Sequence, residues 1–130
     1  MSVFVFDGRN RIVFASVSEG CPLASILPQD QLEQALLPLV AAQRNAQMAS
    51  DNELRAAEGA NGLRLVFRSH LDFVLLAVGR ASCLQLQLEL KMLHKLISFL
   101  TGLDWRLIGK QAEVLRRLLE RWREESPYSL

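Results

Sequence analysis

The chain has 130 residues, with 15 basic and 14 acidic side chains and a formal net charge of +1. Half of its residues are hydrophobic and 22% are charged, a composition that excludes an intrinsically disordered protein. The near-zero net charge argues against a protein that binds nucleic acid or anionic membranes by bulk electrostatics. A chain of this length is one domain with a sizeable core, and we assign residues 1–125 to that domain and residues 126–130 to a flexible tail.

Cysteine usage and hydropathy indicate the cellular compartment. Cys21 and Cys83 are too few for a disulfide scaffold, and their spacing matches no zinc motif. The first residues lack the basic region of a secretory signal, and the longest apolar run, residues 73–78, is far shorter than the roughly 20 residues of a membrane span. We therefore expect a cytoplasmic, reduced protein. Its mean hydropathy of +0.14 is high for a small domain and suggests a surface that contacts another protein.

The N-terminal residues predict a β-hairpin. Residues 3–6 and 12–15 are β-branched and aromatic runs, and Asp7-Gly8 between them is a strong turn signal. Because the first run is apolar at every position, we expect a central strand that is covered on both faces.

A helix is predicted next. Asp30 and Glu33 form a candidate N-cap and capping box. Pro38 lies within the apolar pattern and predicts a kink or a break between two short helices. Residues 44–52 are polar and alanine-rich, and we assign them to the helix end and a loop. The apolar positions at helical spacing are Leu32, Leu36, Leu39 and Val40.

Three further strands are predicted before residue 80. Residues 53–58 are short and charged, which suits an edge strand. Asn61-Gly62 is a hairpin turn that leads to a strand at 63–68. Residues 69–72 form the next turn, and residues 73–78, apolar throughout, form a second central strand.

The C-terminal part is predicted to be helical. Ser82 caps a long helix with two apolar stripes, and Gly102 ends it in a left-handed conformation. A last helix spans about residues 110–124, with Glu113–Arg117 as a stabilising pair. The predicted order is therefore β-β-α-β-β-β-α-α, an α+β fold in which a five-stranded antiparallel sheet packs against helices. The stripes of the long helix are Leu86, Leu90, Leu93, Ile97 and Leu100, and Leu84, Leu88, Met92, Leu96 and Phe99.

No residue pattern names a reaction. His94 is expected on a solvated surface, and His70 with Asp72 in a turn lacks the further ligands that a metal needs. Cys83 is expected to be a buried small hydrophobe, and no phosphate-binding glycine motif occurs. We therefore predict no catalytic, cofactor-binding or metal-binding residues, and a protein that is not an enzyme.

The basic and aromatic candidates have plain interpretations. Arg9 and Arg11, and the pair Arg116-Arg117, have acidic neighbours, and we expect them on solvated faces. Trp105 follows the predicted helix end, where it is either a docking aromatic or the lid over the helix junction.

Several sequence stretches resemble the first longin domain of the Mon protein family. Residues 62–67 and 71–80 are similar to a strand pair of that domain, and residues 93–102 (LHKLISFLTG) are similar to its "LxxQILSLLTG" helix end. Residues 4–14 match its "FxLSxxGKPIY" hairpin more loosely. The resemblance covers residues 3–103 well and the last helix weakly. Fuzzy and the Hermansky–Pudlak longin proteins belong to the same broader group.

The resemblance implies a role in vesicle traffic. Mon proteins pair with a Ccz partner through their first longin domains, and the pair acts as a guanine-nucleotide exchange factor for a late-endosomal Rab GTPase. Mon proteins carry three longin domains and this sequence holds one, so we expect no exchange by this chain alone. The resemblance implies a cytoplasmic protein that associates with endosomal or vacuolar membranes only through its complex. In longin pairs the first helix and third strand meet the partner, which corresponds here to Leu32, Leu36, Leu39, Val40, Leu54, Ala56 and Glu58.

Three alternatives stay open. The domain could belong to a Fuzzy-type or other trafficking complex. The same element order also fits a profilin-like or PAS-like sensor with a small-ligand cavity between the sheet and the long helix. A longin domain of a vesicle SNARE or a coat small subunit is the third, and the SNARE version is disfavoured because no heptad repeat follows residue 110.

Overall fold

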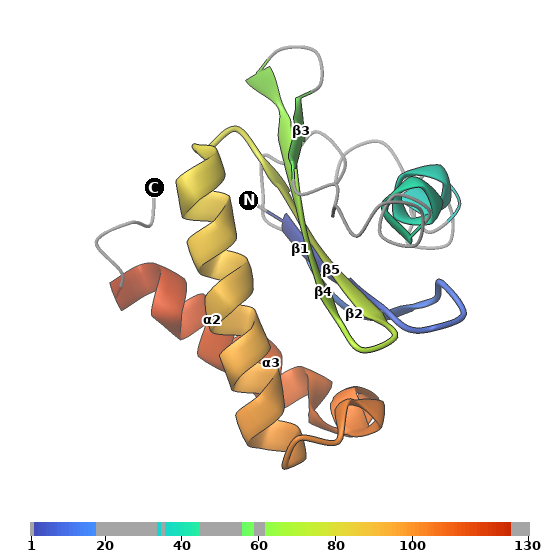
Figure 1. Cartoon of the computed structure of the whole chain (residues 1–130). Coiled ribbons are helices and arrows are strands. Elements are labelled where there is room, and N and C mark those ends of the chain that lie inside the picture. The colour runs from blue at the N-terminus through green and yellow to red at the C-terminus, as the bar shows by residue number, and fades with distance from the viewer. Residues whose placement is uncertain (1, 18–33, 35, 45–55, 59–61, 126–130) are drawn as a thin grey trace.

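The computed structural model describes residues 2–17, 34, 36–44, 56–58 and 62–125 (Figure 1). Its strands are β1 (Ser2–Phe6), β2 (Ile12–Ser16), β3 (Ala56–Glu58), β4 (Arg64–His70) and β5 (Phe73–Gly79). Helices α2 (Cys83–Thr101) and α3 (Ile108–Glu125) follow, joined through the short 3-10 helix η2 (Trp105–Leu107). Residues 36–44 are also helical, and we call them helical segment 36–44.

All neighbouring strands of the sheet are antiparallel, and the strand order is β2-β1-β5-β4-β3. The N-terminal strand β1 therefore lies between its hairpin partner β2 and the much later β5, with Phe4 opposite Leu76. Both β1 and β5 are central, as their uninterrupted apolar sequences predict, and every residue of β1 is buried. The short strand β3 lies at an edge of the sheet, also as predicted.

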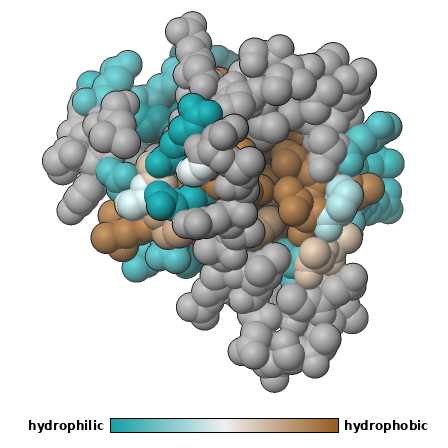
Figure 2. Space-filling model, turned by 90° about the horizontal axis from the view of Figure 1, so that it is seen from above, coloured by the Kyte–Doolittle hydropathy of each residue, from teal (hydrophilic) through white to brown (hydrophobic). Residues whose placement is uncertain are grey.

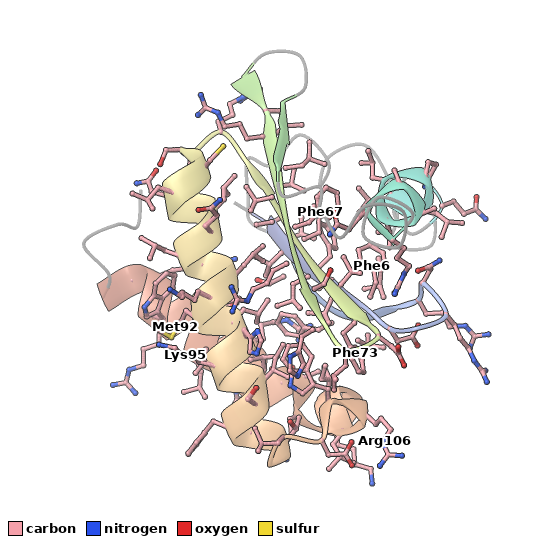
Figure 3. All side chains as sticks on the ribbon, in the orientation of Figure 1. Phe6, Phe67, Phe73, Met92, Lys95 and Arg106 are labelled. Carbon is pink, nitrogen blue, oxygen red and sulfur yellow. The ribbon has the colours of Figure 1, made fainter. Side chains whose placement is uncertain are left out.

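The two faces of the sheet are covered by different elements (Figure 1). Helices α2 and α3 lie on one face and helical segment 36–44 lies on the other. Side chains alternate between the faces because successive residues of a strand point in opposite directions. Phe6 and Phe67, for example, point from the sheet toward helical segment 36–44 (Figure 3). The face under α2 and α3 includes Val3, Val5, Leu75 and Ala77, and the opposite face includes Phe4, Phe6, Leu76 and Val78.

Local signals fix the ends of α2. The side chain of Ser82 accepts a hydrogen bond from the backbone N–H of Gln85, and the Gln85 side chain accepts one from the backbone of Ser82. This reciprocal pair is a capping box. At the other end Gly102 has φ +61°, the left-handed conformation that favours glycine. Both predicted caps are confirmed.

A buried ion pair joins α2 to α3. The Oε1 atom of Glu89 lies 2.5 Å from both Nε and Nη2 of Arg123, and Nη1 of Arg123 donates to the Ser16 hydroxyl at 3.1 Å. Only 3% of the Glu89 side chain is exposed. Desolvation raises the pKa of Glu89 above its ordinary value, although the charge and hydrogen bond of Arg123 oppose this. Glu89 thus belongs to the interior, although it lies among the polar positions of the helix sequence.

Three element predictions differ from the structure. Strand β4 continues to His70, so the turn before β5 is confined to Leu71 and Asp72, because Ser69 and His70 pair with residues of β5. Helix α3 begins at Ile108, two residues before the predicted start. Helical segment 36–44 continues through Pro38, so the break proposed at that residue is not present there. The predicted N-cap residues Asp30 and Glu33 lie outside the described residues.

The α+β class and the antiparallel sheet are confirmed. Among the described residues, no helix combines the length and the apolar character that a membrane crossing requires.

Candidate functional site

The predicted partner surface of the first helix is mostly turned toward the sheet. Leu36 and Val40 are buried between helical segment 36–44 and the sheet, and Leu39 is half-buried against the same cluster. Among the described leucines of the segment, Leu37 faces outward and is 41% exposed. Figure 2 shows the molecule from above, with hydrophobic residues in view to the right of the centre and hydrophilic residues at the right margin. Leu32 lies outside the described residues.

The predicted strand of this surface is placed at the sheet edge. Ala56 pairs with Val66, and Glu58 pairs with Arg64, through the antiparallel β3–β4 ladder. In the described part of the chain, β3 has a strand neighbour on one side only. Leu54 lies outside the described residues.

Two polar residues that the sequence did not single out fasten helical segment 36–44 to the sheet. The Arg44 guanidinium donates to Oδ1 of Asn10 at 2.7 Å and to the backbone carbonyl of Asp7 at 2.6 Å. Gln43 is buried and donates through Nε2 to the Ser69 hydroxyl at 3.3 Å. The Arg44 contacts fix the segment against the β1–β2 turn, and the Gln43 contact joins it to β4. A single Arg or Gln near a predicted helix end does not allow these contacts to be predicted from the sequence.

His94 lies in a cluster of rings rather than on a solvated surface. Its ring centroid lies 4.5 Å from that of His70 and 5.0 Å from that of Trp105, and its Nδ1 accepts a hydrogen bond from Nε of Arg68 at 3.0 Å. Burial, followed by the nearby charges of His70 and Arg68, lowers the pKa of His94 to about 4. The prediction of a solvated His94 is wrong because α2 turns this residue toward β4.

His70 and Trp105 complete the cluster. His70 pairs with Phe73 at the end of β4, and its ring centroid lies 4.3 Å from that of Trp105. Trp105 is buried, and its indole N–H donates to the Ser98 hydroxyl at 3.2 Å. Of the two interpretations of Trp105, the structure supports the lid over the helix junction. The His70–Asp72 turn prediction is wrong for His70, which belongs to the strand.

The remaining chemical candidates contact neighbouring parts of the fold. Cys83 is a free thiol, partly buried against the core under α2. Arg116 is held by Glu113 at 3.0 Å and by the backbone carbonyl of Ala15 at 3.3 Å, and the predicted Glu113–Arg117 pair is present at 3.8 Å. No cluster of three or more histidine, cysteine, aspartate or glutamate residues that could hold a metal ion occurs within the described ranges.

Part of the second apolar stripe of α2 remains at the surface. Leu84 is 64% exposed and Phe99 is 82% exposed, whereas Leu88 is half-buried. The apolar face of α2 is therefore wider than the surface that packs on the sheet, as the two apolar stripes predict.

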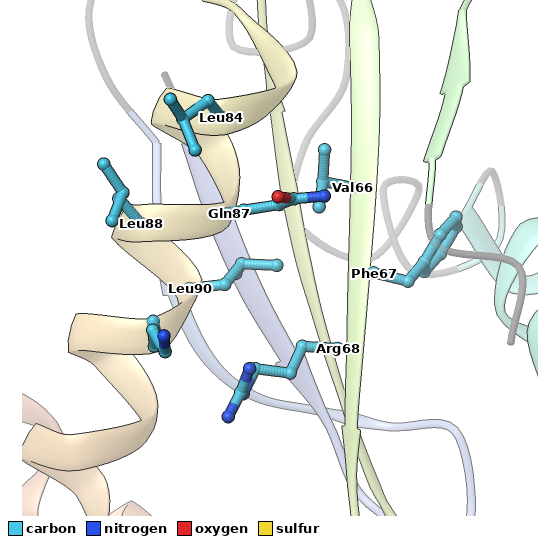
Figure 4. A pocket seen from close by; sticks show the side chains of 8 residues that line it. Val66, Phe67, Arg68, Leu84, Gln87, Leu88 and Leu90 are labelled. Atoms are coloured by element: carbon cyan, nitrogen blue, oxygen red, sulfur yellow. The ribbon is translucent and has the colours of Figure 1, made fainter.

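A groove with a volume of about 310 Å³ lies between α2 and β4 (Figure 4). Helix α2 contacts β4 and β5, while α3 lies on the same face and contacts β2 at the opposite edge of the sheet. The groove therefore lies on the flank of α2 that is turned away from α3. Buried Val66 and Leu90 form its floor, and Leu84 and Lys91 stand exposed at its rim. Its full lining is Val66, Phe67, Arg68, Leu84, Gln87, Leu88, Leu90 and Lys91.

An antiparallel sheet with two long helices on one face and a helical segment on the other defines an α+β domain of the longin type. The chain belongs to the family described as the First Longin domain of FUZ, MON1 and HPS1, whose model matches residues 1–126. This confirms the family resemblance of the sequence and supports the role of a longin domain in a trafficking complex. None of the curated proteins compared with the chain matches it.

Proposed function

We propose that the chain is a non-catalytic interaction domain of a Mon/Ccz-type complex, which acts as a guanine-nucleotide exchange factor for a late-endosomal Rab GTPase. The observation that carries the proposal is membership of the longin family, which spans residues 1–126. The partners would be a Ccz-type longin protein and the GTPase. The chain would be cytoplasmic and would reach endosomal or vacuolar membranes only as part of that complex.

The edge strand β3 supports a sheet-to-sheet contact with the partner. Its three residues pair with β4, and among the described residues no strand lies on its other side. A strand edge offers unpaired backbone donors and acceptors, so a partner strand can extend the sheet, with main-chain hydrogen bonds that provide affinity and fix register.

The outward side of helical segment 36–44 would form the second part of this contact. Leu37 provides an exposed apolar side chain there, while Leu36 and Val40 hold the segment on the sheet from below. The interface would therefore use Leu37 and the exposed part of Leu39, and it would depend on Leu36 and Val40 only through folding.

Nucleotide exchange in such a complex needs no acid, base or metal from this domain. A surface that binds the nucleotide-free GTPase more tightly than the nucleotide-bound form shifts the equilibrium toward release. The ring cluster around His94 and the thiol of Cys83 have no part in the proposal.

The test is capture of a Ccz-type longin protein by the whole chain, measured by pull-down and by size-exclusion chromatography with light scattering. Leu37→Glu is expected to abolish the complex, because a charge would enter the apolar contact. Val114→Glu on α3 is the matched control, since Val114 is 45% exposed on the opposite face of the sheet.

Both variants should melt close to the parent protein, because 41% of Leu37 and 45% of Val114 are exposed and neither residue belongs to the buried core. A Leu37→Glu variant that still forms the complex would contradict the proposed surface. Failure of the parent chain to capture the Ccz-type protein would contradict the Mon/Ccz assignment.

A further inference from the structure

We propose that the groove between α2 and β4 binds a short peptide segment of a partner protein that carries an acidic residue close to a leucine-like residue. The carboxylate would lie on Arg68 and Lys91, and the aliphatic side chain would lie against Leu84, Leu88 and Val66. This site is separate from helical segment 36–44, which covers the other face of the sheet, so the inference does not depend on the proposed function.

The charge of the groove selects the acidic part of the ligand. Arg68 and Lys91 are the charged residues of the lining, and both are basic. Within the described residues, neither of them forms an ion pair with a carboxylate. A guanidinium of this kind is suited to a carboxylate, because it can donate two parallel hydrogen bonds to the two oxygens.

The contact with His94 orients Arg68 for this task. Nε of Arg68 donates to Nδ1 of His94 at 3.0 Å. This hydrogen bond uses one guanidinium donor and leaves those of Nη1 and Nη2. Figure 4 shows the side chain of Arg68 extending from β4 toward α2. The histidine acts as an acceptor in its neutral form, so it holds the guanidinium without neutralising it.

The apolar residues of α2 that line the groove indicate an apolar side chain in the ligand. Leu84 and Leu88 are one turn apart and line the groove together with Val66. The exposed position of Leu84 is unfavourable for an isolated domain and is relieved when an aliphatic side chain covers it. Because Leu84, Gln87 and Lys91 are all exposed, the groove is open, which suits a peptide better than an enclosed small ligand.

The distance between the apolar and the basic end of the groove determines the spacing of the two ligand residues. Leu84 and Lys91 are seven positions apart on α2, which corresponds to about 10 Å along the helix at roughly 1.5 Å per residue. An extended peptide covers that distance in about three residues. A glutamate or aspartate about three positions from a leucine therefore fits, without any covalent modification.

The test uses a fluorescein-labelled, terminally blocked peptide that contains the sequence Glu-Ala-Ala-Leu-Leu and measures its anisotropy with the whole chain. Saturable binding that weakens at high salt is expected. Peptides with Gln for Glu, or with Ser for both Leu residues, should each bind at least about tenfold more weakly. No saturable binding of the parent peptide at about 1 mM would overturn the proposal.

Protein variants separate the groove from the general charge of α2. Lys91→Glu is expected to weaken binding at least about tenfold, whereas Lys95→Glu, one turn further along and outside the groove, should change it by less than about threefold. Leu84→Ser should weaken binding, and Phe99→Ser, an exposed apolar residue at the far end of the same helix, should not. All four positions are exposed, so the circular-dichroism melts should match the parent.

Three outcomes would overturn the assignment. Equal losses for Lys91→Glu and Lys95→Glu would indicate non-specific attraction to a basic helix. Equal losses for Leu84→Ser and Phe99→Ser would indicate general stickiness of the apolar stripe. A peptide with phosphoserine in place of Glu that binds more than about tenfold tighter would show a phosphate site instead of a carboxylate site.

Discussion

Removal of Arg123 should destabilise the protein in a pH-dependent manner, because it leaves Glu89 buried without its cation. We consider Arg123→Met, which keeps much of the aliphatic length of the side chain. Glu89 is 3% exposed and Arg123 is 19% exposed, so the ion pair is largely shielded from water. A carboxylate left alone in such a site either stays charged at a high cost or takes up a proton.

The free energy needed to protonate Glu89 is the upper limit of the electrostatic cost of removing Arg123. The ordinary pKa of the carboxyl is 4.5, so holding a proton on Glu89 at pH 7 costs about 3.4 kcal/mol at roughly 1.4 kcal/mol per pH unit. At pH 5 the same step costs about 0.7 kcal/mol. We expect Arg123→Met to lower the free energy of unfolding by about 2–3 kcal/mol at pH 7, and by less than about 1 kcal/mol at pH 5.

The direction of the pH dependence follows from the direction in which the pKa of Glu89 is shifted. The pKa of Glu89 is raised in the folded protein, so the folded state binds more protons than the unfolded chain above pH 4.5. The contribution of this group to stability is therefore fully present below pH 4.5 and falls as the pH rises through the folded pKa. Without Arg123 the folded pKa rises further, and the fall extends to higher pH.

Urea unfolding of the parent and the variant, followed by tryptophan fluorescence at pH 5 and pH 7, measures this difference. The double variant Glu89→Gln with Arg123→Met removes both charges and should lie within about 1 kcal/mol of the parent at both pH values. An equal loss at pH 5 and pH 7, or a double variant as unstable as the single one, would show that the unpaired Glu89 carboxylate is not the source of the instability.

Three further predictions concern the fold. Because the pKa of His94 is lowered to about 4, its contribution to stability is present above pH 6.5 and should be lost as the pH falls toward 4. The urea midpoint of the His94→Gln variant should therefore depend less on pH across that range than the midpoint of the parent protein. Gly102→Ala should cost about 1 kcal/mol in thermal unfolding because of its φ of +61°, whereas Gly109→Ala in α3, where nothing lies within 4 Å of an added Cβ, should be neutral or stabilising. Leu90→Ala should cost about 2–5 kcal/mol, and Leu84→Ala less than about 0.5 kcal/mol, by the same measurement.

The strands and helix caps could be predicted because their signals are local. The apolar runs of β1 and β5, the charge of the edge strand, and the capping residues Ser82 and Gly102 each act over a few positions. Local sequence also places a turn at Asp7-Gly8, where the Asp7 carboxylate accepts from the backbone N–H groups of Arg9 and Arg11.

The side-chain environments could not be predicted, because they depend on pairs distant in the sequence. His94 looks solvated among Lys91 and Lys95 until β4 brings Arg68 and His70 against it. In the same way, a helical pattern cannot tell which apolar residues face the sheet, and Leu36, which the family resemblance places at a partner surface, belongs to the core.

The position of β1 between β2 and β5 has a consequence for synthesis. Strand β1 is apolar at four of five positions, and its pairing with β5 must wait until residues 73–79 have been made. During that delay the nascent β1–β2 hairpin exposes both of its faces and also the β1 edge that β5 later covers, which makes it a substrate for chaperones and a template for aggregation. Nascent chains stalled before residue 73 should therefore aggregate, while chains released after β5 have every strand of the sheet available.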